Sequence, residues 1–172
     1  MSRRRCRAPC DRVLTPEAQQ EFWYQAFHQL SLVEGILDGH EQAIREYIGH
    51  FWSHWSGPSF EPEDVDLDRL ARVYAVPGAF SASVAWYRAG SGTVATSLRE
   101  LTEDRGEPIT VPTTVLWPEC DPLFPPAWGD RLNEFFADVT VTRLAAVGHF
   151  VPREAPRQVT EAVMRVLAGP RP

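Results

Sequence analysis

The stretch VPTTVLW, residues Val111–Trp117, decides the fold of this chain. It is β-branched and nearly all apolar, which is typical of a strand that is covered on both faces of its sheet. A second strand-like run covers 139–144, a helical pattern lies between the two at 125–136, and another follows at 156–168. The order strand, helix, strand, helix predicts a βαβα unit over 111–172, with two parallel strands joined by a right-handed crossover.

Each predicted strand is followed by a residue that can carry chemistry. Asp121 comes after the first strand, and His149 comes after the second, in Gly148-His149-Phe150. Because parallel strands end at the same edge of a sheet, we expect the two side chains to lie close together. A histidine that acts as a base needs a carboxylate to fix its tautomer and to stabilise the imidazolium. Asp121 and His149 are therefore the candidate catalytic residues.

Each of these residues, taken alone, also has a structural interpretation. Asp121 precedes Pro122, and Asp-Pro is a common turn pair. His149 follows a glycine that lets the backbone turn tightly, as an ordinary loop histidine would. We expect Cys120 to be a small buried neighbour of Asp121 and not a nucleophile, since the adjacent carboxylate disfavours its thiolate.

A pair of histidines lies upstream. His50 and His54 are spaced i, i+4, as in a two-histidine metal face. Phe51 occupies the place of the glutamate in such motifs, and no third ligand is evident. We interpret both histidines as structural, and we expect neither a metal nor a cofactor.

The chain before 111 is predicted to be a helical layer. Thr15-Pro16 is a helix start, with a capping hydroxyl and proline at the first helical position. Helices are expected over 15–30, 32–37, 41–55, 67–75, 78–89 and 93–101, and 41–55 has the strongest amphipathic period. Residues 15–101 thus form one domain, 102–110 a polar linker, and 111–172 a second domain. The basic segment 1–14 is either a disordered tail or not native family sequence.

Composition limits the partners and the location. The 172 residues carry a net charge of −6, which disfavours nucleic acid as a partner. No apolar run approaches the roughly 18 residues that a membrane span needs, and no apolar stretch follows the basic N-terminus as in a signal peptide. Three cysteines do not make a disulfide framework, so the expected location is the cytoplasm.

From Val111 on, the chain resembles the C-terminal part of α/β-hydrolases. The matching residues are the first strand, then Asp121-Pro122-Leu123, then the sequence VGHFVP at 147–152. Pro118 and Cys120 depart from the usual pattern. The helical layer resembles the cap domain of epoxide hydrolases and related dehalogenases, through WYQAFHQ at 23–29 and AWYRA at 85–89. The fold class expected is α/β: a partial α/β-hydrolase fold, with a mostly helical cap before the βαβα unit.

The resemblance implies roles for four residues. Tyr24 and Tyr87 would hydrogen-bond the epoxide oxygen of a small apolar substrate, and His149, oriented by Asp121, would activate the water that cleaves an alkyl-enzyme ester. Considered without the resemblance, Tyr24 is a half-exposed amphipathic tyrosine. Tyr87 is then a packed residue whose hydroxyl reaches a local acceptor.

The nucleophile that begins this chemistry has no candidate in residues 1–172. They contain neither a Gly-x-nucleophile-x-Gly elbow nor a His-Gly-x-Pro segment. The resemblance therefore implies a C-terminal fragment or truncated member that is inactive alone. The alternatives are a non-catalytic binding protein, which could self-associate through the exposed edge of its sheet, and a haloalkanoate dehalogenase-type hydrolase, which Trp86-Tyr87-Arg88-Ala89-Gly90 also resembles.

Overall fold

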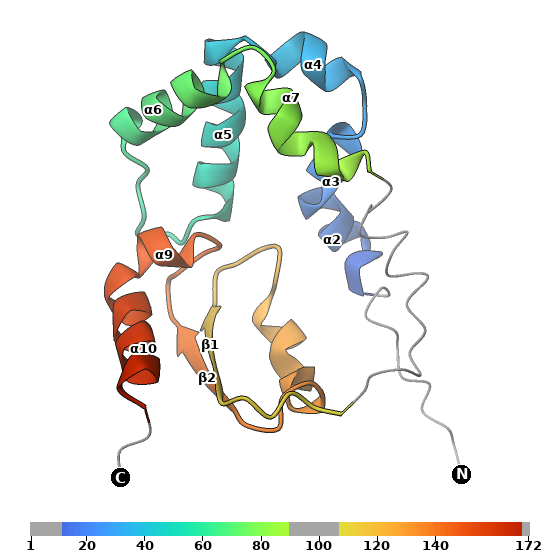
Figure 1. Cartoon of the computed structure of the whole chain (residues 1–172). Coiled ribbons are helices and arrows are strands. Elements are labelled where there is room, and N and C mark those ends of the chain that lie inside the picture. The colour runs from blue at the N-terminus through green and yellow to red at the C-terminus, as the bar shows by residue number, and fades with distance from the viewer. Residues whose placement is uncertain (1–11, 90–106, 170–172) are drawn as a thin grey trace, which may run out of the picture. The chain divides into compact units, whose positions relative to one another are not determined.

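The computed structural model describes residues 12–89 and 107–169, and the chain divides into two compact units (Figure 1). Unit 1 comprises Met1–Gly49 and Glu63–Asp104, and unit 2 comprises His50–Pro62 and Arg105–Pro172. The helix expected over 93–101, most of the linker and most of the basic tail lie outside the described residues. Of that tail, Arg12 and Val13 are helical.

Unit 1 is built from helices. They are α2 (Pro16–Glu21), α3 (Trp23–Phe27), α4 (Leu32–Leu37), the part of α5 (Glu41–Trp55) up to Gly49, α6 (Asp64–Tyr74), α7 (Ala79–Val84) and the 3-10 helix η1 (Ala85–Tyr87). Thr15 caps α2 as expected, because its hydroxyl accepts the Ala18 N–H at 3.2 Å. The helix expected over 15–30 is interrupted at Phe22, where φ is −91° and ψ is 9°. The apolar period runs through this break and gives no sign of it.

The other differences in unit 1 concern helix ends. Helix α6 begins at Asp64 and not at Leu67, so Asp64 and Asp66 lie in its first turn. Carboxylates are favourable there, because they interact with the positive end of the helix dipole. The helix expected to reach Ala89 is α-helical only to Val84 and continues as η1.

The core of unit 1 gathers side chains from α4, α5, α6 and α7. The fully or nearly fully buried members are Val33, Leu37, Ile44, Ala71, Phe80 and Val84.

At the start of α7 the Asp38 carboxylate accepts the N–H groups of Gly78 at 2.8 Å and of Ser81 at 3.2 Å. These bonds hold the pKa of Asp38 below its usual range, Gly78 first and Ser81 second.

Unit 2 contains a two-stranded parallel sheet. Its strands are β1 (Thr113–Pro118) and β2 (Val139–Leu144), in register from Thr113 opposite Val139 to Pro118 opposite Leu144. Around them are the 3-10 helix η2 (Pro126–Glu134), α9 (Val151–Glu154), α10 (Pro156–Ala168) and the end of α5. Strand β1 begins two residues later than predicted, after Pro112, which has no N–H to give to the ladder.

The helix expected over 125–136 is a 3-10 helix and not an α-helix. Gly129 lies within the segment, and glycine in a helix interior weakens an α-helix. Gly129 also lies against the ring of Trp117, since a Cβ at this glycine would be 3.3 Å from the ring. The tight winding thus brings η2 close to one face of β1.

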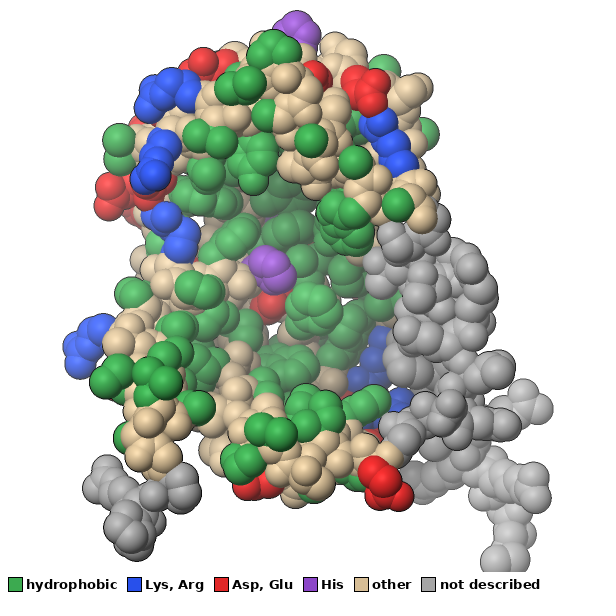
Figure 2. Space-filling model, in the orientation of Figure 1, with side chains coloured by type: hydrophobic (Ala, Val, Ile, Leu, Met, Phe, Trp, Pro, Cys, Tyr) green, Lys and Arg blue, Asp and Glu red, His purple; other side chains and the backbone are tan. Residues whose placement is uncertain are grey.

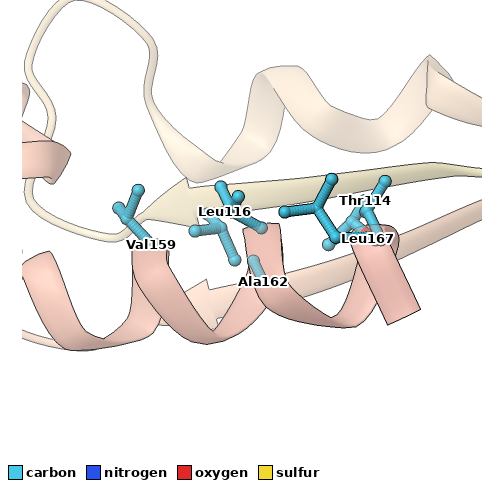
Figure 3. A pocket seen from close by; sticks show the side chains of 7 residues that line it. Thr114, Leu116, Val159, Ala162 and Leu167 are labelled. Atoms are coloured by element: carbon cyan, nitrogen blue, oxygen red, sulfur yellow. The ribbon is translucent and has the colours of Figure 1, made fainter. Parts of the chain in front are cut away.

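The opposite face of β1 meets α10 across an open groove. The groove has a volume of about 330 Å³ and is lined by Thr114, Leu116, Val159, Ala162, Val163, Val166 and Leu167 (Figure 3). Hydrophobic side chains are prominent at the surface over α10 (Figure 2), and Leu167 is 74% exposed. Strand β1 therefore has elements on both faces, but the cover from α10 is incomplete.

Within the described ranges, no helix combines the length and the apolar character needed to cross a membrane.

Candidate active site

Asp121 lies directly beyond the end of β1 and is only 6% exposed. Its Oδ1 atom accepts the N–H groups of Leu123 at 2.8 Å and of Phe124 at 3.2 Å. An aspartate that bonds the backbone two residues on forms an Asx turn, so the turn interpretation of Asp121 is correct. It does not exclude a second role, because the other carboxylate oxygen is directed elsewhere.

The second oxygen contacts the predicted histidine. Oδ2 of Asp121 lies 3.0 Å from Nδ1 of His149, so the structure brings together the two residues that the sequence placed at one sheet edge. An ionised carboxylate can only accept a hydrogen bond, and therefore Nδ1 carries the hydrogen. In the neutral ring Nε2 then has the lone pair, and it can take a proton from water or substrate.

Aromatic side chains surround the His149 ring. The ring centroids of Trp55 and Phe150 lie 5.3 Å and 5.4 Å from it, both edge-to-face, and Phe124 is stacked at 6.2 Å. Trp55 itself is buried. The His149 side chain remains 29% exposed. The base thus sits among apolar walls and is still reachable from solvent.

The loop that carries His149 lies against the end of α5, with no space between the backbones. The His149 N–H donates to the Trp55 carbonyl at 2.7 Å. A Cβ at Gly148 would be 2.2 Å from that carbonyl oxygen, and a Cβ at Gly57 would be 2.1 Å from the Ala146 oxygen. Both positions accept only glycine without a shift of the chain.

Glu154 of α9 accepts three backbone hydrogen bonds at this junction. Oε2 accepts the N–H groups of Gly148 at 2.7 Å and of Gly57 at 2.8 Å, and Oε1 accepts the N–H of Phe150 at 3.0 Å. Neither Glu154 nor Gly57 was predicted to belong to the site. The only signal in the sequence is that Glu154 is an acid five residues after His149, and Gly57 before Pro58 has the pattern of an ordinary helix end.

Tyr24 and Tyr87 are neighbours in unit 1. Their ring centroids lie 6.1 Å apart at an interplanar angle of 89°. Burial, and then the neighbouring Tyr24, raise the pKa of Tyr87 well above its usual value. The Tyr87 phenol is therefore protonated across the physiological range, and its O–H can donate a hydrogen bond.

His28 completes this aromatic cluster, and sequence reasoning gave it no role. Its Nε2 lies 2.7 Å from the Tyr47 hydroxyl, and its ring centroid is 4.7 Å from that of Tyr87. Burial, and then the charge of Arg88, lower the pKa of His28 to about 4. The position of His28 one turn after Tyr24 was the available signal.

Cys120 and the histidine pair His50 and His54 lie outside the two candidate pairs. Cys120 is exposed and not buried as predicted. Pro118 is the last buried residue of β1, and the chain turns after it, so Cys120 no longer follows the alternation of the strand. His50 and His54 are exposed with stacked rings, and the described residues contain no group of three possible metal ligands.

The structure therefore forms two pairs from the four predicted site residues. Asp121 and His149 are in contact within unit 2, and Tyr24 and Tyr87 are neighbours within unit 1. Residues 50–62, predicted as part of the helical layer, contribute Trp55 and Gly57 to unit 2.

Comparison with solved structures identifies the fold. The chain is similar to an epoxide hydrolase of the α/β-hydrolase superfamily from metagenomes of hot environments (25% identity, 95% of this chain and 56% of that chain, TM-score 0.67). It is also similar to the Bacillus megaterium epoxide hydrolase (20% identity, 92% of this chain and 56% of that chain, TM-score 0.65). A third similar structure is Cfl2 from Burkholderia cenocepacia (24% identity, 88% of this chain and 49% of that chain, TM-score 0.63). No protein-family model and no curated protein matches the chain.

These similarities confirm the predicted fold class. The chain is mostly helical with a two-stranded parallel sheet, and it has part of the α/β-hydrolase fold. It spans about half the length of the solved structures that it matches.

Proposed function

We propose that this chain supplies the acid and the histidine of an epoxide-hydrolase-like site that acts on a small apolar epoxide. The observation that carries the proposal is the contact of 3.0 Å between Asp121 and His149. Such a pair is the water-activating part of hydrolases that pass through a covalent ester. The similarity to hydrolase structures supports the same class of reaction.

The chemical step assigned to this pair is the cleavage of an alkyl-enzyme ester. Nε2 of His149 takes one proton from a water molecule while the water oxygen attacks the ester carbonyl carbon. The Asp121 carboxylate stabilises the imidazolium that results. The bond to the alkyl oxygen then breaks, and the imidazolium returns its proton to that oxygen, which leaves as part of a diol. The nucleophile of the preceding step is not among residues 1–172 and would come from polypeptide outside them.

Tyr24 and Tyr87 are the proposed donors to the epoxide oxygen, with unit 1 as the cap domain. Opening the ring places negative charge on this oxygen, and fixed hydroxyl donors stabilise it. The two rings lie 6.1 Å apart in the same unit, which supports a shared role for their hydroxyls.

The proposal can be tested by complementation. The purified chain is assayed on an aryl glycidyl ether alone and together with the nucleophile-bearing half of one of the matched epoxide hydrolases. We expect no turnover from the chain alone, and turnover from the mixture that His149→Ala abolishes. His50→Ala, at an exposed histidine of the same unit, is the control and should have no effect. Turnover that survives His149→Ala would refute the proposal.

A second proposal, self-association, is supported by the surface of unit 2. Strand β1 pairs with β2 along one edge, and the described residues provide no strand for its other edge. The groove beside it is lined almost entirely by apolar side chains. An unpaired edge next to an apolar groove favours association with another copy of the chain. Sedimentation should show oligomers that Val163→Glu dissociates, and a monomer at high concentration would contradict this.

The dehalogenase alternative and the cytoplasmic location stay predictions. The dehalogenase alternative depends on the segment 86–90. In that segment Trp86 is 52% exposed and packs on Tyr87, with ring centroids 3.7 Å apart.

A further inference from the structure

We propose that Glu154 is a positioning residue for His149, and that its carboxylate fixes the backbone that presents the imidazole to Asp121. This inference rests on the proposed role of His149 as the base. It assigns to Glu154 a part in that role which goes beyond holding α9 in place.

The peptide groups around His149 are held on both sides of the residue. Three consecutive N–H groups, those of Gly148, His149 and Phe150, all have fixed acceptors. The outer two donate to Glu154, and the middle one donates to the carbonyl of Trp55. With its own N–H and both flanking N–H groups held, the backbone of His149 has little freedom to rotate.

The Glu154 carboxylate also ties the histidine loop to a distant part of the chain. The oxygen of Glu154 that accepts Gly148 also accepts Gly57, which lies 97 residues away in sequence. One carboxylate oxygen therefore joins the histidine loop to the segment after α5. The Phe150 carbonyl accepts the Glu154 N–H at 3.0 Å, so the link between these two residues is reciprocal. The carboxylate and the loop hold each other in place.

The histidine loop is packed without free space around its glycines. The glycines at this junction leave no room for even one extra carbon atom. Ala146 has a φ of 58°, in the left-handed region that residues with a Cβ rarely adopt. A loop in this conformation would relax if its hydrogen bonds were lost. The distance of 3.0 Å between His149 and Asp121 therefore depends on the bonds that Glu154 accepts.

A carboxylate suits this place better than an amide. Three N–H groups converge on two oxygens, and both oxygens must accept. Glutamine would offer one oxygen, and its NH₂ group would face an N–H donor. Bonds to an ionised carboxylate are also stronger than bonds to a neutral acceptor.

The test is the tautomer of His149 in the full chain, measured by ¹⁵N NMR of the imidazole nitrogens. The unsubstituted chain should show mainly the Nδ1–H form that Asp121 accepts. Glu154→Gln should lower the population of that form at least two-fold, and Glu154→Asp should restore part of it. Glu161→Gln is the matched control, because Glu161 is an exposed acid of the adjacent helix whose contact with Arg165 spans 4.0 Å. The Glu161→Gln substitution should leave the tautomer populations of His149 unchanged.

The result that would overturn the inference is an unchanged His149 tautomer in folded Glu154→Gln. If that variant does not fold, the unsubstituted chain decides the matter through couplings across hydrogen bonds. The amides of Gly57, Gly148 and Phe150 must all couple to the Glu154 carboxyl carbon, and a missing coupling also refutes the inference. Failure of the proposed function looks different, because turnover in the complementation assay would then survive His149→Ala while the His149 tautomer still responded to Glu154→Gln.

Discussion

The loop that carries His149 is held mainly by hydrogen bonds from its backbone N–H groups, whereas the ring of His28 is held mainly by contacts with other side chains. His149 is held by Trp55, Asp121 and the Glu154 carboxylate, at glycines without room for a Cβ. His28 is held by the Tyr47 hydroxyl and by aromatic rings in contact with its own. Backbone contacts of the first kind are broken by a single added carbon, while packing of the second kind can adjust by small steps. We therefore expect substitutions to act abruptly in unit 2 and gradually in unit 1.

The largest effect should come from Gly148→Ala. The new Cβ would meet the Trp55 carbonyl oxygen at 2.2 Å, so the backbone of the histidine loop has to move. We expect a loss of about 3 kcal/mol or more in the free energy of unfolding. Urea denaturation followed by fluorescence measures it. Gly35→Ala, in helix α4 with open space around it, is the control and should be neutral or slightly stabilising.

The next effect concerns catalysis in the complemented protein. Removing the Tyr87 hydroxyl by Tyr87→Phe should slow opening of the epoxide about 100-fold, because a donor to the developing alkoxide is lost. Tyr24→Phe should have a similar effect. Single-turnover kinetics separates this step from hydrolysis of the ester. The control is Tyr74→Phe on α6, and an equal loss in that variant would count against a special role for the pair.

The pH dependence of stability should come from His28. Its folded pKa of about 4 lies below the ordinary value of 6.5, so between these values the unfolded chain binds the proton and the folded chain does not. The free energy of unfolding should therefore fall as pH decreases from 6.5 to 4, by about 2 kcal/mol. Chemical denaturation at several pH values measures it. In His28→Gln this part of the decrease should be absent, and an unchanged pH profile would contradict the assignment.

A smaller effect is expected from the ion pairs between α5 and α6. Arg45 contacts Asp64 and Asp68 at 2.6 Å each, and all three side chains are partly or largely exposed. Solvent screens such pairs, so Arg45→Gln should lower the unfolding temperature only slightly. Thermal unfolding at low and high salt tests this, because the difference should shrink as salt is added. A destabilisation as large as that of Gly148→Ala would show that the comparison of the two units is wrong.

Much of the fold could be predicted because it depends on local patterns. The bounds of α4, α5, β2 and α10 agree with those expected from apolar periodicity, capping and glycine or proline at the ends. The contact between Asp121 and His149 was predicted as well, since parallel strands end at one edge of a sheet.

The remaining features depend on contacts that periodicity does not encode. The 3-10 winding of η2 accompanies the close approach of Gly129 to Trp117, and the break at Phe22 lies within an unbroken apolar pattern. The bond between Gly57 and Glu154 spans 97 residues. A glycine that ends a helix and a glycine required by a neighbouring backbone look the same in a sequence.

The most direct test of the central claim is whether His149 acts on a covalent ester. The chain with His149→Gln is combined with the nucleophile-bearing half, exposed to the epoxide, and examined by mass spectrometry. The account predicts that the nucleophile-bearing half gains the mass of one substrate molecule and keeps it, while the unsubstituted chain turns over. Sustained turnover by the His149→Gln protein, with no adduct, would contradict it.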